Sequence, residues 1–66
     1  MKLQCIKGFT DSDNINVICL QGDVITINEV AEGSIFCEGE YGWCAGFELA
    51  LTPERIAECF RVFKDN

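Results

Sequence analysis

Histidine is absent from this chain of 66 residues, so the side chain that most often exchanges protons near neutral pH is missing. Neither a Ser-His-Asp nor a Cys-His catalytic arrangement can be built without it. The glycine-rich phosphate loops of nucleotide-binding enzymes are also missing. A chain this short buries only about 60% of its unfolded surface and leaves little room for a substrate cleft. We therefore expect a non-enzymatic protein with no catalytic residues and no cofactor.

Basic residues are few and confined to the two ends of the chain. No lysine or arginine occurs between Lys7 and Arg55, whereas nine acidic residues do, and the formal net charge is −6. Direct nucleic-acid binding is disfavoured, because contacts with phosphates depend on lysine and arginine. Two interpretations of the acids stay open: they keep a small domain soluble, or they face a partner protein with a basic surface.

Long apolar runs are missing as well. No run approaches the roughly 18 residues that a membrane span needs, and the first residues lack the apolar core of a secretory signal. We expect a soluble, cytoplasmic protein that does not bind membranes. The five cysteines include no Cys-x-x-Cys pair and fit no disulfide framework, so we expect free thiols that fill the core, with no metal. A cysteine-based metal or redox protein is the alternative.

The features that are present predict a single β-rich domain over residues 1–66. Alternating apolar and polar residues, or β-branched runs, predict strands over 2–7, 15–19 and 24–30. Glycines in Glu32-Gly33 and in Glu38-Gly39-Glu40 predict two hairpin turns, one on each side of a strand over 34–37. A third arm is expected over 41–49.

After this arm, the spacing of apolar residues changes from the two-residue period of a strand to the longer period of a helix. Thr52-Pro53-Glu54 combines a capping hydroxyl, a proline at the first helical position and an acid in the first turn, which predicts a short helix. Residues 60–64 are then expected to form a closing strand, with a continued helix as the alternative. The five phenylalanines and the one tryptophan provide the bulk for a core. Phe9, Phe36, Phe60 and Phe63 are expected to be core residues, and Trp43 to be buried or half-buried.

Two segments resemble those of Src-homology-3-like domains. Leu20-Gln21-Gly22-Asp23-Val24-Ile25-Thr26-Ile27 resembles the family's turn and alternating strand after the first long loop, and Tyr41-Gly42-Trp43-Cys44-Ala45-Gly46 resembles its Gly-Trp-Trp-x-Gly strand. The tail over 51–62 is similar to small phage and prophage proteins of this fold. The resemblance implies a five-stranded Src-homology-3-like barrel with one short C-terminal helical turn before the last strand, acting as an interaction module.

The resemblance carries over only part of the family's peptide-binding groove. Members that bind proline-rich peptides use tyrosines of the first strand region and a tryptophan, and only Trp43 has a counterpart here. Cys5-Ile6-Lys7-Gly8-Phe9 stands where the family has tyrosines. Proline-rich peptides are therefore not the expected ligands.

The charge pattern and the expected fold together suggest a binding face. A closed sheet would gather Lys2, Lys7, Arg61 and Lys64 on one side, while acids project from the hairpins. The candidate partner-binding residues are Glu32, Glu38, Glu40, Tyr41 and Trp43. The function predicted is an acidic protein-interaction domain, a phage or prophage accessory protein that modulates a host or phage protein. A nucleic-acid-mimicking inhibitor of anti-restriction or anti-CRISPR type is an alternative, and an open edge strand would allow a homodimer.

Overall fold

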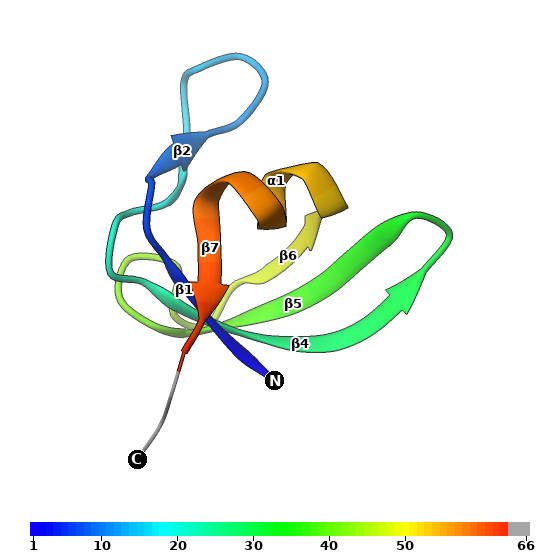
Figure 1. Cartoon of the computed structure of the whole chain (residues 1–66). Coiled ribbons are helices and arrows are strands. Elements are labelled where there is room, and N and C mark those ends of the chain that lie inside the picture. Colours follow the sequence, from blue (N-terminus) through cyan, green and yellow to red (C-terminus); the bar gives the residue numbers. More distant parts are fainter. Residues whose placement is uncertain (64–66) are drawn as a thin grey trace.

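The computed structural model describes residues 1–63, which are mainly β-strand with one short helix (Figure 1). Five strands form an antiparallel sheet in the order β6-β5-β4-β1-β7, and β2 pairs with β3 in a separate hairpin. The elements are β1 (Lys2–Cys5), β2 (Phe9–Thr10), β3 (Val17–Cys19), β4 (Val24–Ala31), β5 (Ser34–Tyr41), β6 (Glu48–Leu51), α1 (Pro53–Cys59) and β7 (Phe60–Val62).

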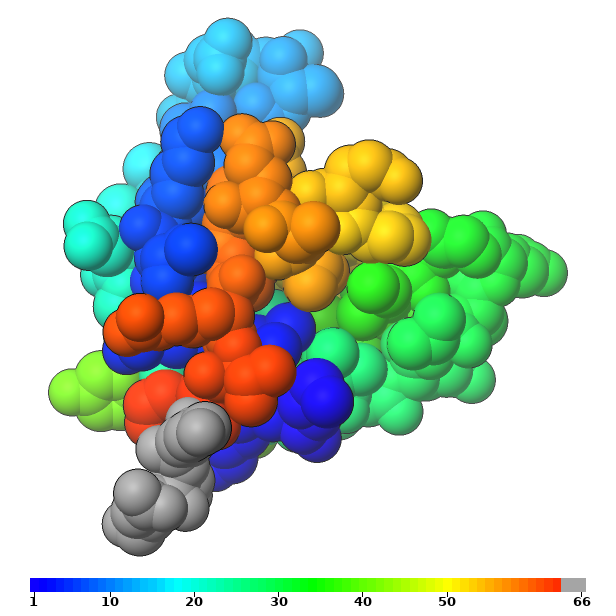
Figure 2. Space-filling view, in the orientation of Figure 1, coloured from blue at the N-terminus to red at the C-terminus, as the bar shows by residue number. Residues whose placement is uncertain are grey.

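The long hairpin of β4 and β5 is the largest part of the sheet and projects from the body of the molecule (Figures 1 and 2). Its turn lies at Glu32 and Gly33, which both have positive φ angles, 53° and 79°. Two consecutive positive φ angles are typical of the tight turns that match the twist of paired strands. The hairpin turn predicted at Glu32-Gly33 is thus confirmed.

The second predicted turn, at Glu38-Gly39-Glu40, is wrong, because β5 runs straight through these residues. Gly39 is needed for a different reason. The loop over residues 42–47 folds back on β5, so that a Cβ atom at position 39 would overlap the carbonyl group of Cys44. The Gly39 N–H donates to the Phe47 carbonyl at 2.8 Å, and the Gly46 N–H donates to the Gly39 carbonyl at 2.9 Å. The glycine therefore marks a close backbone approach inside a strand.

Helix α1 begins where the sequence predicts. The Thr52 hydroxyl accepts a hydrogen bond from the Arg55 N–H at 3.1 Å, and Pro53 occupies the first turn, where a proline costs no hydrogen bond. The helix ends at Cys59, and β7 then pairs with β1, with Leu3 opposite Val62. The closing strand is thus confirmed, although Lys64 lies outside the described residues. None of the helical structure within residues 1–63 has the length and apolar character to cross a bilayer.

The core lies between the inner face of the sheet, the β2–β3 hairpin and α1. It is made of small and medium side chains, and all five cysteines contribute to it. The predicted packing of the thiols in the core is confirmed. Phe60 is buried against Phe9 in an edge-to-face pair with centroids 5.9 Å apart. Phe36, expected in the core, is 39% exposed because its side chain alternates with buried Cys37 and faces outward.

The five-stranded sheet is present, but it does not close into the expected barrel. Strands β6 and β7 are its two edges, and within residues 1–63 they do not pair with each other. The seven-residue helix α1 connects these two edge strands (Figure 1). The expected pairing of the first and last strands is present, with Gln4 opposite Arg61, while Lys64, the last of the expected basic group, lies outside the described residues.

Candidate functional site

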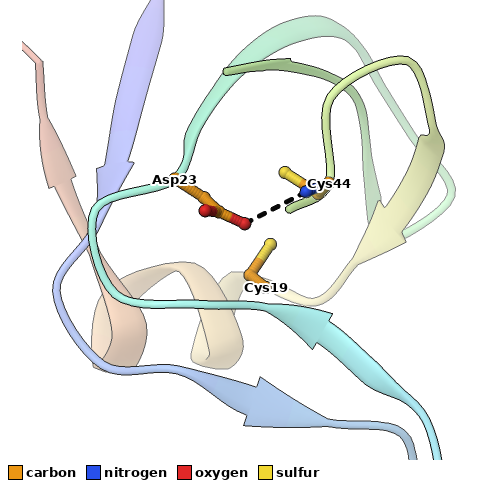
Figure 3. A group of neighbouring side chains, drawn as sticks. All are labelled: Cys19, Asp23 and Cys44. Carbon is orange, nitrogen blue, oxygen red and sulfur yellow. Dashed lines mark hydrogen bonds between the residues drawn. The ribbon is translucent and has the colours of Figure 1, made fainter. Parts of the chain in front are cut away.

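A buried carboxylate connects three segments that surround the candidate site. Asp23, which directly precedes β4, is 4% exposed. Its Oδ2 atom accepts a hydrogen bond from the Cys44 N–H at 3.1 Å (Figure 3). Oδ2 also accepts one from the Leu20 N–H at 3.1 Å, and Oδ1 accepts one from the Trp43 N–H at 3.0 Å. Bonds between a carboxylate and backbone N–H groups are among the stronger hydrogen bonds in proteins. Asp23 therefore fixes the β5–β6 loop against the end of β3.

The β5–β6 loop needs a glycine to reach this carboxylate. Gly42 has a φ angle of 96°, which side chains rarely adopt, and a Cβ atom there would overlap the carboxylate of Asp23. The loop consequently points Cys44 into the core and Trp43 outward. The expectation of a buried or half-buried Trp43 is wrong, because 59% of this residue is exposed. Its backbone is held by Asp23, but its ring lies at the surface.

The ring of Trp43 forms one wall of an open apolar groove. The indole N–H donates to the Val17 carbonyl at 3.1 Å, which attaches the ring to β3. Phe47, from the same loop, is 64% exposed on the groove. The groove measures about 500 Å³ and is lined by Val17, Ile18, Trp43, Phe47, Glu48 and Leu49. Exposed aromatic side chains that gather around a hollow are typical of protein-binding surfaces.

A second hollow continues this groove between the β2–β3 hairpin and β6. Ile18, Glu48 and Leu49 line both hollows, so the two share a wall. The second hollow reaches Asp11 in the β2–β3 loop and Arg55 in α1. The guanidinium of Arg55 lies 4.6 Å from the centre of the Phe9 ring. The two hollows therefore adjoin each other along β6.

Charge changes sign across the outer face of the sheet. Glu48, Glu38, Thr26 and Lys2 lie opposite one another on β6, β5, β4 and β1, and so form one row on this face. The row begins with two facing carboxylates at the edge of the groove and ends with an ammonium group. Lys7 forms an ion pair with Glu58 at 3.0 Å, and this pair lowers the pKa of the Glu58 carboxyl. Along this row the acidic end therefore lies at β6, which borders the groove, and the basic end at β1.

The five residues predicted to bind a partner do not form a single surface. Glu32 lies at the tip of the β4–β5 hairpin, while Tyr41 ends β5 at the opposite end of that strand. Tyr41 is 70% exposed and lines a separate hollow with Lys2 and Phe63. Glu38 and Glu40 lie on the outer face of β5 instead of in a turn, and Glu40 accepts a hydrogen bond from the Thr26 hydroxyl at 2.7 Å. Only Trp43 lines the groove itself.

Several groove residues are not among the binding residues predicted from the sequence. Phe47 was assigned to a strand, although Gly46, with a φ angle of 85°, places it at the end of a loop. Val17 and Glu48 carry no distinctive local signal, since each is one residue of an alternating pattern. Asp23 was interpreted as part of a turn, and only the hydrogen bonds to Trp43 and Cys44, about twenty positions away in the sequence, identify it as an anchor.

Three buried groups with metal-binding chemistry also meet beneath the loop. The Cys19 and Cys44 thiols and the Asp23 carboxylate approach one another closely (Figure 3). Burial raises the pKa of the Cys19 and Cys44 thiols above the ordinary value, and the nearby Asp23 charge raises both further. As they stand, these thiols are protonated and unreactive at neutral pH.

Comparison with known proteins reveals no relatives. The chain matches no family model, no curated protein and no solved structure at a significant level.

Proposed function

We propose that this chain is a small protein-interaction domain that binds an extended, basic segment of a partner protein in the groove between β3 and β6. The observation that carries the proposal is the apolar groove, in which Trp43 and Phe47 are both more than half exposed. Burying two such rings on a ligand removes apolar surface from water, which is the main favourable contribution to association.

Charge at the rim of the groove supports a basic ligand. Glu48 lines the groove, and Glu38 lies opposite it on the neighbouring strand β5, so a second carboxylate stands behind the one in the groove. The adjoining hollow carries both Asp11 and Arg55, so it adds no net charge to that of the groove. Lysine or arginine residues in a partner would relieve the repulsion between the acids and accelerate encounter with a chain whose net charge is −6.

The edge position of β6 supports an extended ligand. Within residues 1–63, β6 pairs with β5 on one side only, and its other side borders the groove. A peptide in the β conformation can add to such an edge through backbone hydrogen bonds, while alternate side chains enter the hollows. A second copy of this chain could use the same edge, which would give the homodimer expected from an open edge strand.

We further propose that the fold is an open variant of the Src-homology-3-like arrangement. The order of elements supports it: a sheet with the first strand between the last strand and β4, a polar hairpin after β1, and a helical turn before the last strand. Fold alone does not determine function, so the groove and not the fold carries the binding proposal. The phage-accessory role and the nucleic-acid-mimic role remain predictions from the sequence.

The proposal is tested with synthetic extended peptides in which one aromatic or aliphatic residue is flanked by lysines, compared with peptides carrying glutamate in place of lysine. We expect the lysine peptides to bind and the glutamate peptides not to bind. Trp43→Ala should weaken binding at least about tenfold, since exposed tryptophans are frequent hot spots. Tyr41→Ala, which truncates an equally exposed ring in a different hollow, should leave binding unchanged.

Charge reversal provides the second half of the test. Glu48→Lys should weaken binding of the lysine peptides, whereas Glu32→Lys, the same change at the hairpin tip, should have little effect beyond that of net charge. Equal losses for the two reversals would show that only the overall charge matters. Equal losses for Trp43→Ala and Tyr41→Ala would exclude the groove as the binding surface.

A further inference from the structure

The cluster beneath the Trp43 loop has the geometry of a metal site. The sulfur atoms of Cys19 and Cys44 and a carboxylate oxygen of Asp23 all lie within 4.8 Å of one another. The residues come from three segments: the end of β3, the residue before β4 and the β5–β6 loop (Figure 3). All three are buried, with Cys19 and Cys44 at 0% and 1% exposure. Three buried ligands, two thiols and one carboxylate, therefore converge on one point.

The carboxylate of Asp23 is held in place as a metal ligand needs to be. Three backbone N–H groups donate to it, two to Oδ2 and one to Oδ1. An ionised carboxylate offers about four acceptor positions, so Oδ1 keeps one free. Hydrogen bonds from outside the first coordination sphere orient the ligands in natural metal sites. Asp23 already has this support in the absence of any ion.

We propose that Cys19, Cys44 and Asp23 form a binding site for one zinc-class divalent ion. Cysteine sulfur and aspartate oxygen are both established zinc ligands, whereas calcium and magnesium prefer oxygen alone and copper(I) prefers sulfur alone. Binding replaces the two thiol protons, which pass to water, and forms two metal–sulfur bonds and one metal–oxygen bond. No oxidation or reduction is involved.

The thiol of Cys5 is near this cluster but is hydrogen-bonded elsewhere. The Cys5 N–H donates to the Asp23 carbonyl at 2.7 Å, so Cys5 is adjacent to the cluster. Its thiol, however, donates to the Lys7 carbonyl at 3.2 Å. The chain therefore supplies three ligands to the proposed site, and Cys5 is not one of them.

Metal binding at this cluster would also act on the groove. Cys44 directly follows Trp43, and Cys19 ends the strand whose Val17 carbonyl accepts the Trp43 indole N–H. A metal ion that joins Cys19 to Cys44 would thus connect the two walls of the groove from below. This consequence depends on the proposed function, but the metal site does not.

Cobalt(II) is the direct probe, since it occupies zinc sites and absorbs light when thiolates bind it. The full chain, kept reduced by a phosphine, is titrated with Co²⁺ and then with Zn²⁺. We expect a thiolate-to-cobalt absorption band that saturates at one ion per chain and disappears when Zn²⁺ is added. Because even outer-sphere partners affect metal affinity roughly 10–100-fold, Cys19→Ala and Cys44→Ala should each weaken Zn²⁺ binding at least about tenfold.

Cys37→Ala is the matched control, because Cys37 is an equally buried thiol that belongs to β5 and lies outside the cluster. It should bind Zn²⁺ as the unchanged chain does. If a variant fails to fold, the unchanged chain still shows which cysteines bind the ion. Addition of Zn²⁺ should shift the Cβ resonances of Cys19 and Cys44 and leave that of Cys37 in place. Absence of the cobalt band, or shifts confined to other cysteines, would overturn the proposal.

Discussion

The carboxylate of Asp23 holds the backbone of Trp43, since Oδ1 accepts the Trp43 N–H at 3.0 Å. One of these residues is buried and the other is exposed. The bond therefore fixes the backbone of Trp43 to the core, and so holds in position the surface ring that lines the groove. A binding surface positioned in this way is ordered before a partner arrives, which lowers the entropic cost of association.

Asp23→Asn is expected to destabilise the protein. The amide group keeps one acceptor oxygen but replaces the other with an NH₂ donor, which would face backbone N–H groups that have no alternative partner. A buried donor left unpaired costs about 1–3 kcal/mol. Urea unfolding measures this loss. Asp13→Asn, at an exposed position in the β2–β3 loop, serves as the control and should unfold at the same urea concentration as the unchanged chain.

Gly42→Ala should cost more stability than Gly46→Ala. Both glycines have positive φ angles, so both substitutions strain the backbone by a similar amount. Only at Gly42 would the added methyl group also overlap the Asp23 carboxylate, whereas nothing lies within 4 Å at Gly46. Thermal unfolding of the two variants compares them directly. Equal melting temperatures would mean that the Asp23 contact with the loop is unimportant.

Glu38→Gln should stabilise the protein by a few tenths of a kcal/mol, because Glu38 faces Glu48 across β5 and β6 and like charges in such pairs repel. The gain should shrink as salt is added. A double-mutant cycle isolates the pair: in the Glu48→Gln background, the same substitution should give almost no gain. A gain that persists in that background would assign the effect to net charge.

The buried thiol of Cys37 should make stability fall at alkaline pH. Burial raises the pKa of this thiol above its ordinary value of 9.0. As the pH rises through 9, the unfolded chain loses the thiol proton while the folded chain keeps it, so the free energy of unfolding decreases. One thiol contributes at most about 1.4 kcal/mol per pH unit. Below pH 8 it contributes no pH dependence.

The Cys37→Ser variant separates the contribution of this thiol to the pH dependence of stability from that of the other cysteines. Serine does not titrate in this range, so the stability difference between the unchanged chain and the variant should narrow as the pH rises from 8 to 10. Urea unfolding at several pH values follows the difference. A difference that stays constant over this range would show that Cys37 is not kept protonated by burial.

Local signals in the sequence were sufficient for much of the fold. The strand over 24–30, the Glu32-Gly33 turn and the helix start at Thr52 depend on neighbouring residues, and the structure confirms them. The strand expected over 2–7 is present but ends at Cys5. Gly39 was misinterpreted because a glycine in a strand and a glycine in a turn look alike locally. What distinguishes them here is the loop carrying Cys44, which approaches Gly39 from the next connection in the chain.

The site was less predictable, because its parts meet only through tertiary contacts. Trp43 was named from the sequence, but its partner Val17 is 26 positions away, and their hydrogen bond has no local signature. Cys19 and Cys44 likewise lie 25 positions apart and match no spacing rule for metal ligands. The acids at Glu38 and Glu40 were assigned to a turn, so their place on the outer face of β5 could not be derived.

The groove is tested most directly by titrating the ¹⁵N-labelled chain with a lysine-flanked aromatic peptide and following each resonance. Trp43 is the one tryptophan in the chain, so its indole N–H signal is unambiguous. We predict that this signal and the Phe47 and Glu48 amides shift together, while the Glu32 and Tyr41 amides stay in place. Shifts centred on the β4–β5 hairpin tip, or an indole signal that does not move at saturating peptide, would contradict the account.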